Sequence, residues 1–217
     1  MPRTSDHDTR RRQIAAAVSR VVSRAGLDAA TVARVATEAR VSVGLVQHYF
    51  ASKDDLLLFA YGQVTADIGG RVAALIAAGE KQEQTISAIV SACLTELLPI
   101  DERRRAEFRV THAFLGRALD NPALAEVART TSADIRARLS TAVTNGKECG
   151  EVEPDVDADL AATRMSALVE GLADQLYLDP NRSVGPLTLA AATDETLRAC
   201  LADVFTGECR HHWPSRT

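Results

Sequence analysis

Residues 43–50 carry side chains whose types and spacing suit recognition of nucleic acid rather than catalysis. At about 100° per residue along a helix, Gly44, Gln47 and His48 share one side. The amide of Gln47 can pair with the edge of an adenine or donate to a phosphate, and His48 can donate to a phosphate. Gly44 has no side chain, so the backbone can approach DNA closely there. The other side is apolar and can pack on neighbouring helices; it comprises Val46, Tyr49 and Phe50.

Residues that flank these positions could extend such a contact. Val43 and Leu45 lie on the borders between the two sides, where they could touch thymine methyl groups. Tyr49 and Lys53 could donate to phosphates, and the free N–H groups of a helix that begins near Lys53 also suit a phosphate. The arginine triplet at residues 10–12 either reaches the DNA backbone or minor groove, or forms a solvated arm.

Motifs for other kinds of chemistry are missing. The sequence has no GxSxG, HExxH or phosphate-loop pattern. The best metal-like cluster is Cys209-Arg-His211-His212, and we expect it to lie in a flexible tail. The cysteines form no CxxC pair, so we expect free thiols at Cys93, Cys149, Cys200 and Cys209. The sequence therefore predicts no enzymatic activity, no bound metal and no cofactor.

Composition favours a helical protein, and the lack of a long apolar stretch leads us to expect it in the cytoplasm. Hydrophobic residues make up 46% and charged residues 25% of the 217 residues, which is ordinary for a globular protein. Alanine is frequent and aromatics are only 4%, which favours helices over strands. No stretch reaches the ~18–20 apolar residues that span a bilayer. The net charge is +3 over residues 1–60 and −7 over residues 61–217, so the head is the part that would meet a polyanion.

Three helices must position the residues of the head. Apolar periodicity predicts helices at 9–25, 32–39 and 43–50, with Thr31 and Ser42 as N-caps of the second and third. Two short capped helices joined by a short turn form the skeleton of a helix-turn-helix. The third helix would then enter a major groove. Alternatively, this is an ordinary pair of packed helices in a bundle.

The rest of the chain is predicted to be helical, so the fold class is all-α. Breaks are expected at Gly79, Pro99, Asn121-Pro122, Asn145-Gly146, Pro154 and 179–186, and no segment alternates long enough to be a strand. The predicted helices are 53–78, 82–98, 103–119, 122–145, 157–178 and 187–205. The predicted domains are a DNA-binding domain at 1–52, an effector-binding and dimerisation domain at 53–206, and a disordered tail at 207–217.

The segment from Thr31 to Leu56, TVARVATEARVSVGLVQHYFASKDDL, resembles the DNA-binding signature of the TetR family. The resemblance extends over residues from about 9 to 60 and implies a homodimeric repressor with an inducer site in its C-terminal body. Together with the side-chain chemistry above, it gives a set of candidate DNA contacts: Thr31, Arg40, Val43, Gly44, Leu45, Gln47, His48, Tyr49 and Lys53. Two positions depart from the pattern. Arg40 replaces the usual turn glycine, which costs roughly 1–2 kcal/mol if the residue is left-handed, unless Arg40 binds phosphate. Gln47 stands where the family often has tyrosine.

The C-terminal body resembles the BetI-like branch of this family, through residues 150–160 and 168–176. The resemblance implies a dimer interface made by helices 157–178 and 187–205. Candidate seam residues, which could equally belong to the core of one chain, are Leu168, Leu172, Leu197, Leu201 and Val204.

An effector pocket is expected among the helices of residues 53–178, because a ligand site needs apolar walls with a few polar groups. The candidate lining residues are Tyr61, Phe108, His112, Phe114, Glu170, Asp174 and Tyr177; each could instead be surface or satisfied core. The BetI resemblance suggests choline, but choline recognition needs an aromatic cage, and this chain is poor in aromatics.

The sequence therefore predicts a regulator that binds a pseudo-palindromic operator as a homodimer and is released by an unidentified small molecule. Two alternatives remain: a helical small-molecule-binding protein or enzyme without DNA binding, and a helical adaptor with a vestigial DNA-binding head.

Overall fold

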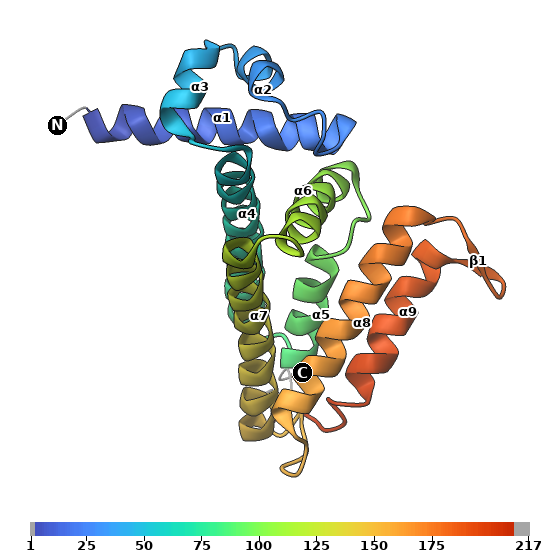
Figure 1. The fold of residues 1–217 in the computed structure, drawn as a ribbon. Coiled ribbons are helices and arrows are strands. Elements are labelled where there is room, and N and C mark those ends of the chain that lie inside the picture. The colour runs from blue at the N-terminus through green and yellow to red at the C-terminus, as the bar shows by residue number, and fades with distance from the viewer. Residues whose placement is uncertain (1–2, 211–217) are drawn as a thin grey trace. The chain divides into compact units, whose positions relative to one another are not determined.

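The computed structural model describes residues 3–210, with side chains from residue 7 onward, and these residues are almost entirely helical (Figure 1). The helices of the head are α1 (Arg3–Ala25), α2 (Val32–Ala39) and α3 (Val43–Tyr49). They are followed by α4 (Lys53–Lys81), α5 (Ile86–Glu96), α6 (Glu102–Ala118), α7 (Pro122–Cys149), α8 (Ala158–Leu178) and α9 (Leu189–Ala202). The all-α fold class is confirmed. The described part of α1 begins six residues before the predicted start at Thr9.

Side-chain caps fix the starts of the two short helices. The hydroxyl of Thr31 accepts a hydrogen bond from the N–H of Arg34 at 3.3 Å. The hydroxyl of Ser42 accepts one from the N–H of Leu45 at 3.1 Å. Both caps were predicted, because a short hydroxyl side chain just before an apolar stripe satisfies N–H groups that the helix leaves free.

Two predicted helix breaks, at Gly79 and at Asn145-Gly146, are wrong. Both glycines lie inside helices, where a missing side chain permits close packing rather than a turn. A Cβ added at Gly79 would lie 2.4 Å from Cγ1 of Ile89, and one at Gly146 would lie 2.6 Å from Cγ2 of Val152. The helices end a few residues later, α4 before Glu83 at a φ of 52° and α7 at Gly150 with a φ of 96°.

A small hairpin lies between α8 and α9, in a region predicted to hold no strand. β1 (Ser183–Val184) pairs antiparallel with β2 (Leu187–Thr188), with Ser183 opposite Thr188. The strands have two residues each and are exposed, so they leave no detectable alternation in the sequence.

Backbone contacts divide the described residues into two compact units. The first contains the chain up to Gly69 together with Asp101–Ala128. Its main core unites α1, α2, α3, α4 and α6 around fully buried residues that include Ile14, Val35, Val46 and Val110. These compact units do not test the predicted boundary between a DNA-binding domain at 1–52 and an effector-binding domain at 53–206, which stays a prediction.

The second unit contains Gly70–Ile100 and the chain from Arg129 onward. Here α8 and α9 pack against each other (Figure 1), and their buried residues include Met165, Leu176 and Leu197. The chain passes between the units at three points, two of which lie inside the helices α4 and α7. At the crossing in α4 stand two exposed glycines, Gly69 and Gly70, and a Cβ added at either would touch nothing.

Part of the predicted disordered tail is packed in this second unit. The N–H of Gly207 donates to the carbonyl of Glu151 at 3.0 Å, and that of Arg210 donates to the carbonyl of Cys149 at 2.7 Å. The remainder of the predicted tail, 211–217, lies outside the described residues. Within residues 3–210, no helix has the length and apolar character needed to cross a membrane.

Candidate nucleic-acid interface

The turn between α2 and α3 places α3 relative to the rest of the head. It begins at Arg40, whose φ of 56° and ψ of 44° are left-handed. The N–H of Arg40 donates to the carbonyl of Thr37, and the N–H of Val41 donates to that of Ala36. These two bonds are the pattern that closes many helices at a glycine. The turn is thus of the kind that a glycine usually closes, formed here with a bulkier residue.

Helix α3 has one buried and one exposed side, as predicted. Val46 is 0% and Phe50 4% exposed, and both belong to the core of the head. Gly44, Gln47 and His48 are exposed, and a Cβ added at Gly44 would touch nothing. The side of α3 that carries Gln47 is therefore exposed and unobstructed, as entry into a DNA major groove requires.

The border residues of α3 differ in exposure. Val43 is 42% exposed, whereas Leu45 and Tyr49 are half-buried. The ring of Tyr49 lies edge-on to that of His48, with centroids 5.2 Å apart, and to that of His7, with centroids 4.7 Å apart. Tyr49 is thereby held between the core and a pair of histidines on the surface of the head.

The arginine triplet does not act as one arm. The guanidinium of Arg11 lies 4.4 Å from the ring centroid of Phe59 and is half-buried, which is a cation–π contact. Arg10 donates to the amide oxygen of Gln13, and Arg12 donates to the carbonyl of Asp8. Both of these arginines are exposed. Arg11 therefore contributes to packing of the head, whereas Arg10 and Arg12 lie at its surface.

Helix α1 holds the C-terminal end of α2 through polar contacts. The guanidinium of Arg20 donates to the carboxylate of Glu38 at 2.6 Å, and this bond holds the pKa of Glu38 below its ordinary value. The amide of Gln13 donates to the carbonyl of Ala39 at 2.8 Å. Both contacts satisfy groups near the C-terminal end of α2, so they fix the point from which the turn to α3 departs.

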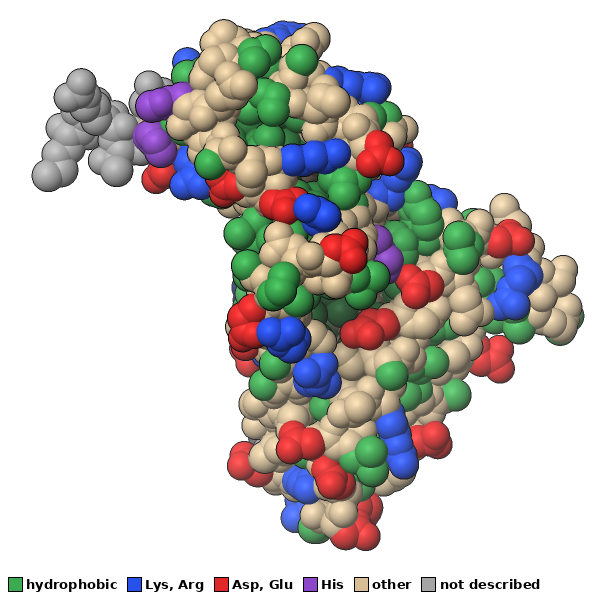
Figure 2. All heavy atoms as spheres, viewed as in Figure 1, with side chains coloured by type: hydrophobic (Ala, Val, Ile, Leu, Met, Phe, Trp, Pro, Cys, Tyr) green, Lys and Arg blue, Asp and Glu red, His purple; other side chains and the backbone are tan. Residues whose placement is uncertain are grey.

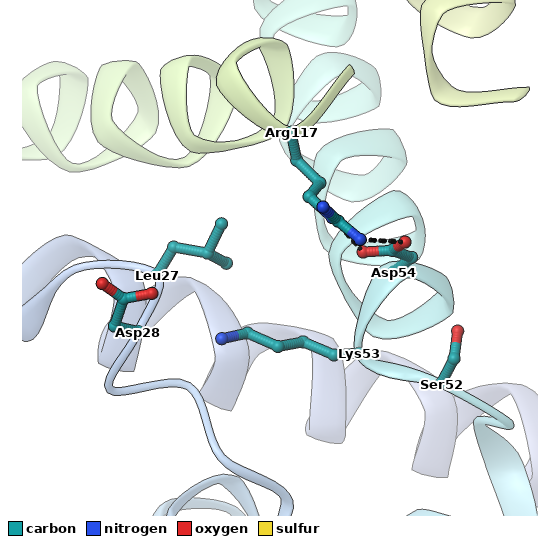
Figure 3. A pocket seen from close by; sticks show the side chains of 6 residues that line it. All are labelled: Leu27, Asp28, Ser52, Lys53, Asp54 and Arg117. Carbon is teal, nitrogen blue, oxygen red and sulfur yellow. Dashed lines mark hydrogen bonds and ion pairs between the residues drawn. The ribbon is translucent and has the colours of Figure 1, made fainter. Parts of the chain in front are cut away.

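Lys53 borders a shallow recess of about 420 Å³ at the start of α4 (Figure 3). Its exposed side chain extends across the recess between Asp28 and Ser52. The hydroxyl of Ser52 accepts from the N–H of Asp55, whose carboxylate in turn accepts from the N–H of Ala51. The N–H of Asp55, one of the donors that were expected to be free for phosphate at the helix start, is therefore already paired, and Lys53 adds a cation beside it.

A bidentate ion pair closes the other side of the recess. Nε of Arg117 lies 2.8 Å from Oδ1 of Asp54, and Nη2 lies 3.2 Å from Oδ2, as the dashed lines in Figure 3 mark. Asn121 donates to the same carboxylate at 3.0 Å. The Arg117 hydrogen bond holds the pKa of Asp54 below its ordinary value. The sequence placed Asp54 in a first helical turn, but it cannot show partners 63 and 67 residues away.

Four of the predicted effector residues lie in the first unit and form two stacked pairs. The rings of Tyr61 and Phe114 are parallel, with centroids 3.9 Å apart, and the two residues are 5% and 0% exposed. The rings of Phe108 and His112 have centroids 3.6 Å apart, with His112 exposed. The Tyr61–Phe114 pair belongs to a small buried core cluster.

The other three predicted effector residues lie on α8 in the second unit. Glu170 and Asp174 are exposed, and Tyr177 is half-buried. The recess beside Lys53 contains none of the seven residues. An effector role for these residues stays a prediction.

Charge on the face shown in Figure 2 is mixed: lysine and arginine side chains alternate with aspartate and glutamate among apolar patches. Net charge alone therefore does not locate a nucleic-acid site. The case for the interface comes from α3, which has an exposed polar side opposite a buried apolar side. The caps at Thr31 and Ser42 and the turn at Arg40 determine where this helix lies in the head.

Two family models match the chain over these same elements. The model described as "Bacterial regulatory proteins, tetR family" matches residues 14–59, and that described as "BetI-type transcriptional repressor, C-terminal" matches residues 87–203. The HTH-type transcriptional regulator PksA of Bacillus subtilis (strain 168) is 30% identical over 97% of this chain and 100% of its own length. The chain belongs to the TetR family of transcriptional regulators. These matches confirm both the family resemblance and the BetI-like branch. Members of this family are transcriptional regulators rather than enzymes, as the sequence predicted.

Other proteins described as transcriptional regulators match over most of their length. The HTH-type transcriptional regulator BetI 1 of Chromohalobacter salexigens is 30% identical over 79% of this chain and 81% of its own. A solved transcriptional regulator from Rhodococcus sp. Rha1 is 28% identical, with a TM-score of 0.74, over 90% of this chain and 96% of its own. A regulator from Saccharomonospora viridis, solved in complex with choline, shares the fold at 22% identity, with a TM-score of 0.73 over 87% of this chain and 93% of its own.

Proposed function

We propose that this TetR-family regulator represses transcription by binding a pseudo-palindromic operator as a homodimer, and that a small molecule releases it. The observation that carries the proposal is the exposed side of α3, where Gly44, Gln47 and His48 stand opposite buried Val46. Such a helix can enter a major groove, and a dimer places two of them about 34–36 Å apart, or at a multiple of that spacing.

The DNA contacts divide by the chemistry of their side chains. Gln47 at the centre of the exposed side is proposed to read a base or bind a phosphate, and Val43 and Leu45 are proposed to contact thymine methyl groups. The proposed phosphate contacts are Thr31, Arg40, His48, Tyr49 and Lys53. Of these, Tyr49 is half-buried, so its hydroxyl has the least freedom to reach DNA.

The proposed dimer uses α8 and α9, but mostly through other residues than the predicted seam, of which only Leu168 is half-buried. Four of the five predicted seam residues are buried within the single chain, which places them in its own core; these are Leu172, Leu197, Leu201 and Val204. A second subunit would meet the positions that remain exposed. On α8 these include Leu160, Ala167 and Leu178, and on α9 they include Ala191 and Ala199.

The proposed effector is a small organic molecule bound by the helical body. Support comes from the BetI-type C-terminal match and from the S. viridis neighbour, whose structure contains choline. In this chain the Tyr61 and Phe114 rings are stacked on each other, so they offer no open cage for a quaternary ammonium ion. The effector class therefore stays broader than choline.

The proposal is tested by measuring how the protein binds the DNA upstream of its own gene. Fluorescence anisotropy at low salt measures the affinity, and random DNA of equal length is the control. We expect tighter binding to the upstream DNA and a stoichiometry of two chains per site. Equal affinity for both DNAs, or no binding at low salt, would favour a helical binding protein without DNA recognition.

Two substitutions separate base reading from phosphate binding. Lys53→Ala should weaken binding to every sequence and lower the slope of log affinity against log salt by about 1. Gln47→Ala should cost roughly 1–3 kcal/mol at one base position if the amide reads a base. An equal loss on operator and random DNA would reassign Gln47 to phosphate.

A further inference from the structure

The end of the described chain is laid directly on the turn that follows α7. Gly207 and Arg210 donate backbone hydrogen bonds to the carbonyls of Glu151 and Cys149. A Cβ added at Gly207 would lie 2.2 Å from the carbonyl oxygen of Gly150, so only glycine permits this approach. Gly150 itself has a φ of 96°, which glycine adopts without strain. The two segments are therefore shaped to bring residue 209 beside residue 149.

Three potential metal ligands converge where these segments meet. The sulfur atoms of Cys149 and Cys209 and a carboxylate oxygen of Glu151 all lie within 4.8 Å of one another. Cys149 and Glu151 are buried, and Cys209 is half-buried. The sulfur of Cys149 lies 3.6 Å from Oε1 of Glu151. A tetrahedral zinc ion with bonds of about 2.3 Å to sulfur and about 2.1 Å to oxygen would hold those two atoms ~3.6 Å apart.

We propose that Cys149, Glu151 and Cys209 form a binding site for a thiophilic divalent cation such as Zn²⁺. The two thiolates and the carboxylate supply three protein ligands of the kind that zinc prefers, and water completes a tetrahedral set. The site is separate from the DNA-binding head and does not depend on the proposed function.

The carboxylate of Glu151 is oriented by the start of α5. Both carboxylate oxygens of Glu151 accept backbone hydrogen bonds from the start of α5, from Ile86 at 2.8 Å and from Ser87 at 2.9 Å. Such bonds fix the orientation of a ligating carboxylate and leave a lone pair on each oxygen for a cation. The buried Glu151, 2% exposed, is thus a side chain held in place beside the two sulfur atoms.

The chemistry of the site suits a divalent cation. The carboxylate of Glu151 and the sulfur of Cys149 are buried side by side, 3.6 Å apart. A divalent cation displaces one proton from each thiol, so binding releases two protons per ion and tightens as pH rises.

The sequence pointed to Cys209 for a different reason. It grouped Cys209 with His211 and His212, and both histidines lie outside the described residues. The partners that the structure supplies, Cys149 and Glu151, are about 60 residues earlier in the chain and form no recognisable ligand spacing.

The proposal is tested on the reduced, metal-free, full-length protein by titration with Cd²⁺, a thiophilic probe with an ultraviolet thiolate-to-metal band. We expect one ion per chain, about two protons released per ion, and competition by Zn²⁺. Cys209→Ser should weaken the affinity at least about tenfold. Cys149→Ser should do the same, but its position is buried, so half-buried Cys209 provides the safer variant.

The matched control is the double variant Cys93→Ser/Cys200→Ser, which removes the two thiols outside the cluster and should bind Cd²⁺ as the unchanged protein does. Circular dichroism of each metal-free variant checks that the fold is kept. The proposal is overturned if the unchanged protein gives no thiolate band, or if folded Cys209→Ser keeps full affinity. It is overturned equally if a thiol count before reduction finds Cys149 and Cys209 joined in a disulfide, with two fewer thiols to titrate.

Discussion

Arg40 occupies a left-handed backbone position at the end of α2, with a φ of 56°. A Cβ in this conformation crowds the following carbonyl oxygen, which costs roughly 1–2 kcal/mol relative to glycine. We predict that Arg40→Gly raises the free energy of unfolding by about 1 kcal/mol, measured by urea denaturation. An unchanged or lower stability would mean that the arginine side chain contributes a compensating contact in the free protein.

The same variant tests whether Arg40 contacts DNA. If Arg40 binds phosphate as proposed, Arg40→Gly should weaken binding to operator and random DNA alike, while the protein itself becomes more stable. A stabilised variant with undiminished affinity would show that Arg40 is a tolerated departure from the family pattern rather than a contact.

Residue-level features that depend on near neighbours could be predicted from sequence. The caps at Thr31 and Ser42 and the two sides of α3 follow from spacing within a few positions, and all were confirmed. The partner of Asp54, the packing of Arg11 on Phe59 and the meeting of Cys149 with Cys209 depend on tertiary structure. No local pattern in one sequence contains that information.

At the scale of elements, Gly79 holds α4 close to α5. A Cβ added there would lie 2.4 Å and 2.8 Å from two side-chain carbons of Ile89. We predict that Gly79→Ala lowers the free energy of unfolding by about 1–3 kcal/mol, because either Ile89 or the α4–α5 contact must shift. Thermal or urea unfolding measures the change.

Gly62→Ala is the matched control, because it lies in the same helix with nothing near its added Cβ. It should raise stability by up to about 1 kcal/mol through helix propensity alone. If both variants are stabilised, the close contact at Gly79 is absent in solution.

The Asp54–Arg117 pair joins the start of α4 to the end of α6 in the first unit, and it makes stability depend on pH. The folded-state pKa of Asp54 is lowered, chiefly by the Arg117 hydrogen bond, from its ordinary value of 3.8. The stabilisation is therefore complete above the unfolded-state pKa and is lost as pH falls through the folded-state value.

We expect the difference in unfolding free energy between the unchanged protein and Asp54→Asn to be constant above about pH 5 and to shrink below about pH 4. Urea denaturation at a series of pH values measures it, and other carboxylates largely cancel in the difference. A difference that does not vary with pH would show that Asp54 is not paired in solution.

Helix boundaries show where element-level prediction fails. Glycine in a single sequence was interpreted as a break at both Gly79 and Gly146, whereas each is a point of close packing inside a helix. Sequence cannot separate the two uses, because the deciding atoms belong to Ile89 and Val152 in other elements.

For the whole molecule, the sequence predicted the order of helices and the family, whereas the compact units are not contiguous in sequence. Residues 101–128 pack with the head although they follow 31 residues of the second unit. Leu172 and Leu197 are buried because of how α8 and α9 pack. Apolar periodicity alone cannot decide whether such residues belong to the core of one chain or to a dimer interface.

The exposed pair Gly69-Gly70 has a consequence for motion within α4. Each glycine weakens a helix interior by about 1 kcal/mol relative to alanine, and neither is required here by a close neighbour. The amide protons around residues 66–74 should therefore exchange with deuterated solvent faster than those in the flanking turns of α4. In the double variant Gly69→Ala/Gly70→Ala, exchange there should slow by about tenfold or more, which hydrogen–deuterium exchange mass spectrometry can follow peptide by peptide. Uniform protection along α4 in the unchanged protein would contradict this. A helix with a local weak point can open briefly at the place where the chain passes from one unit to the other, without either unit unfolding.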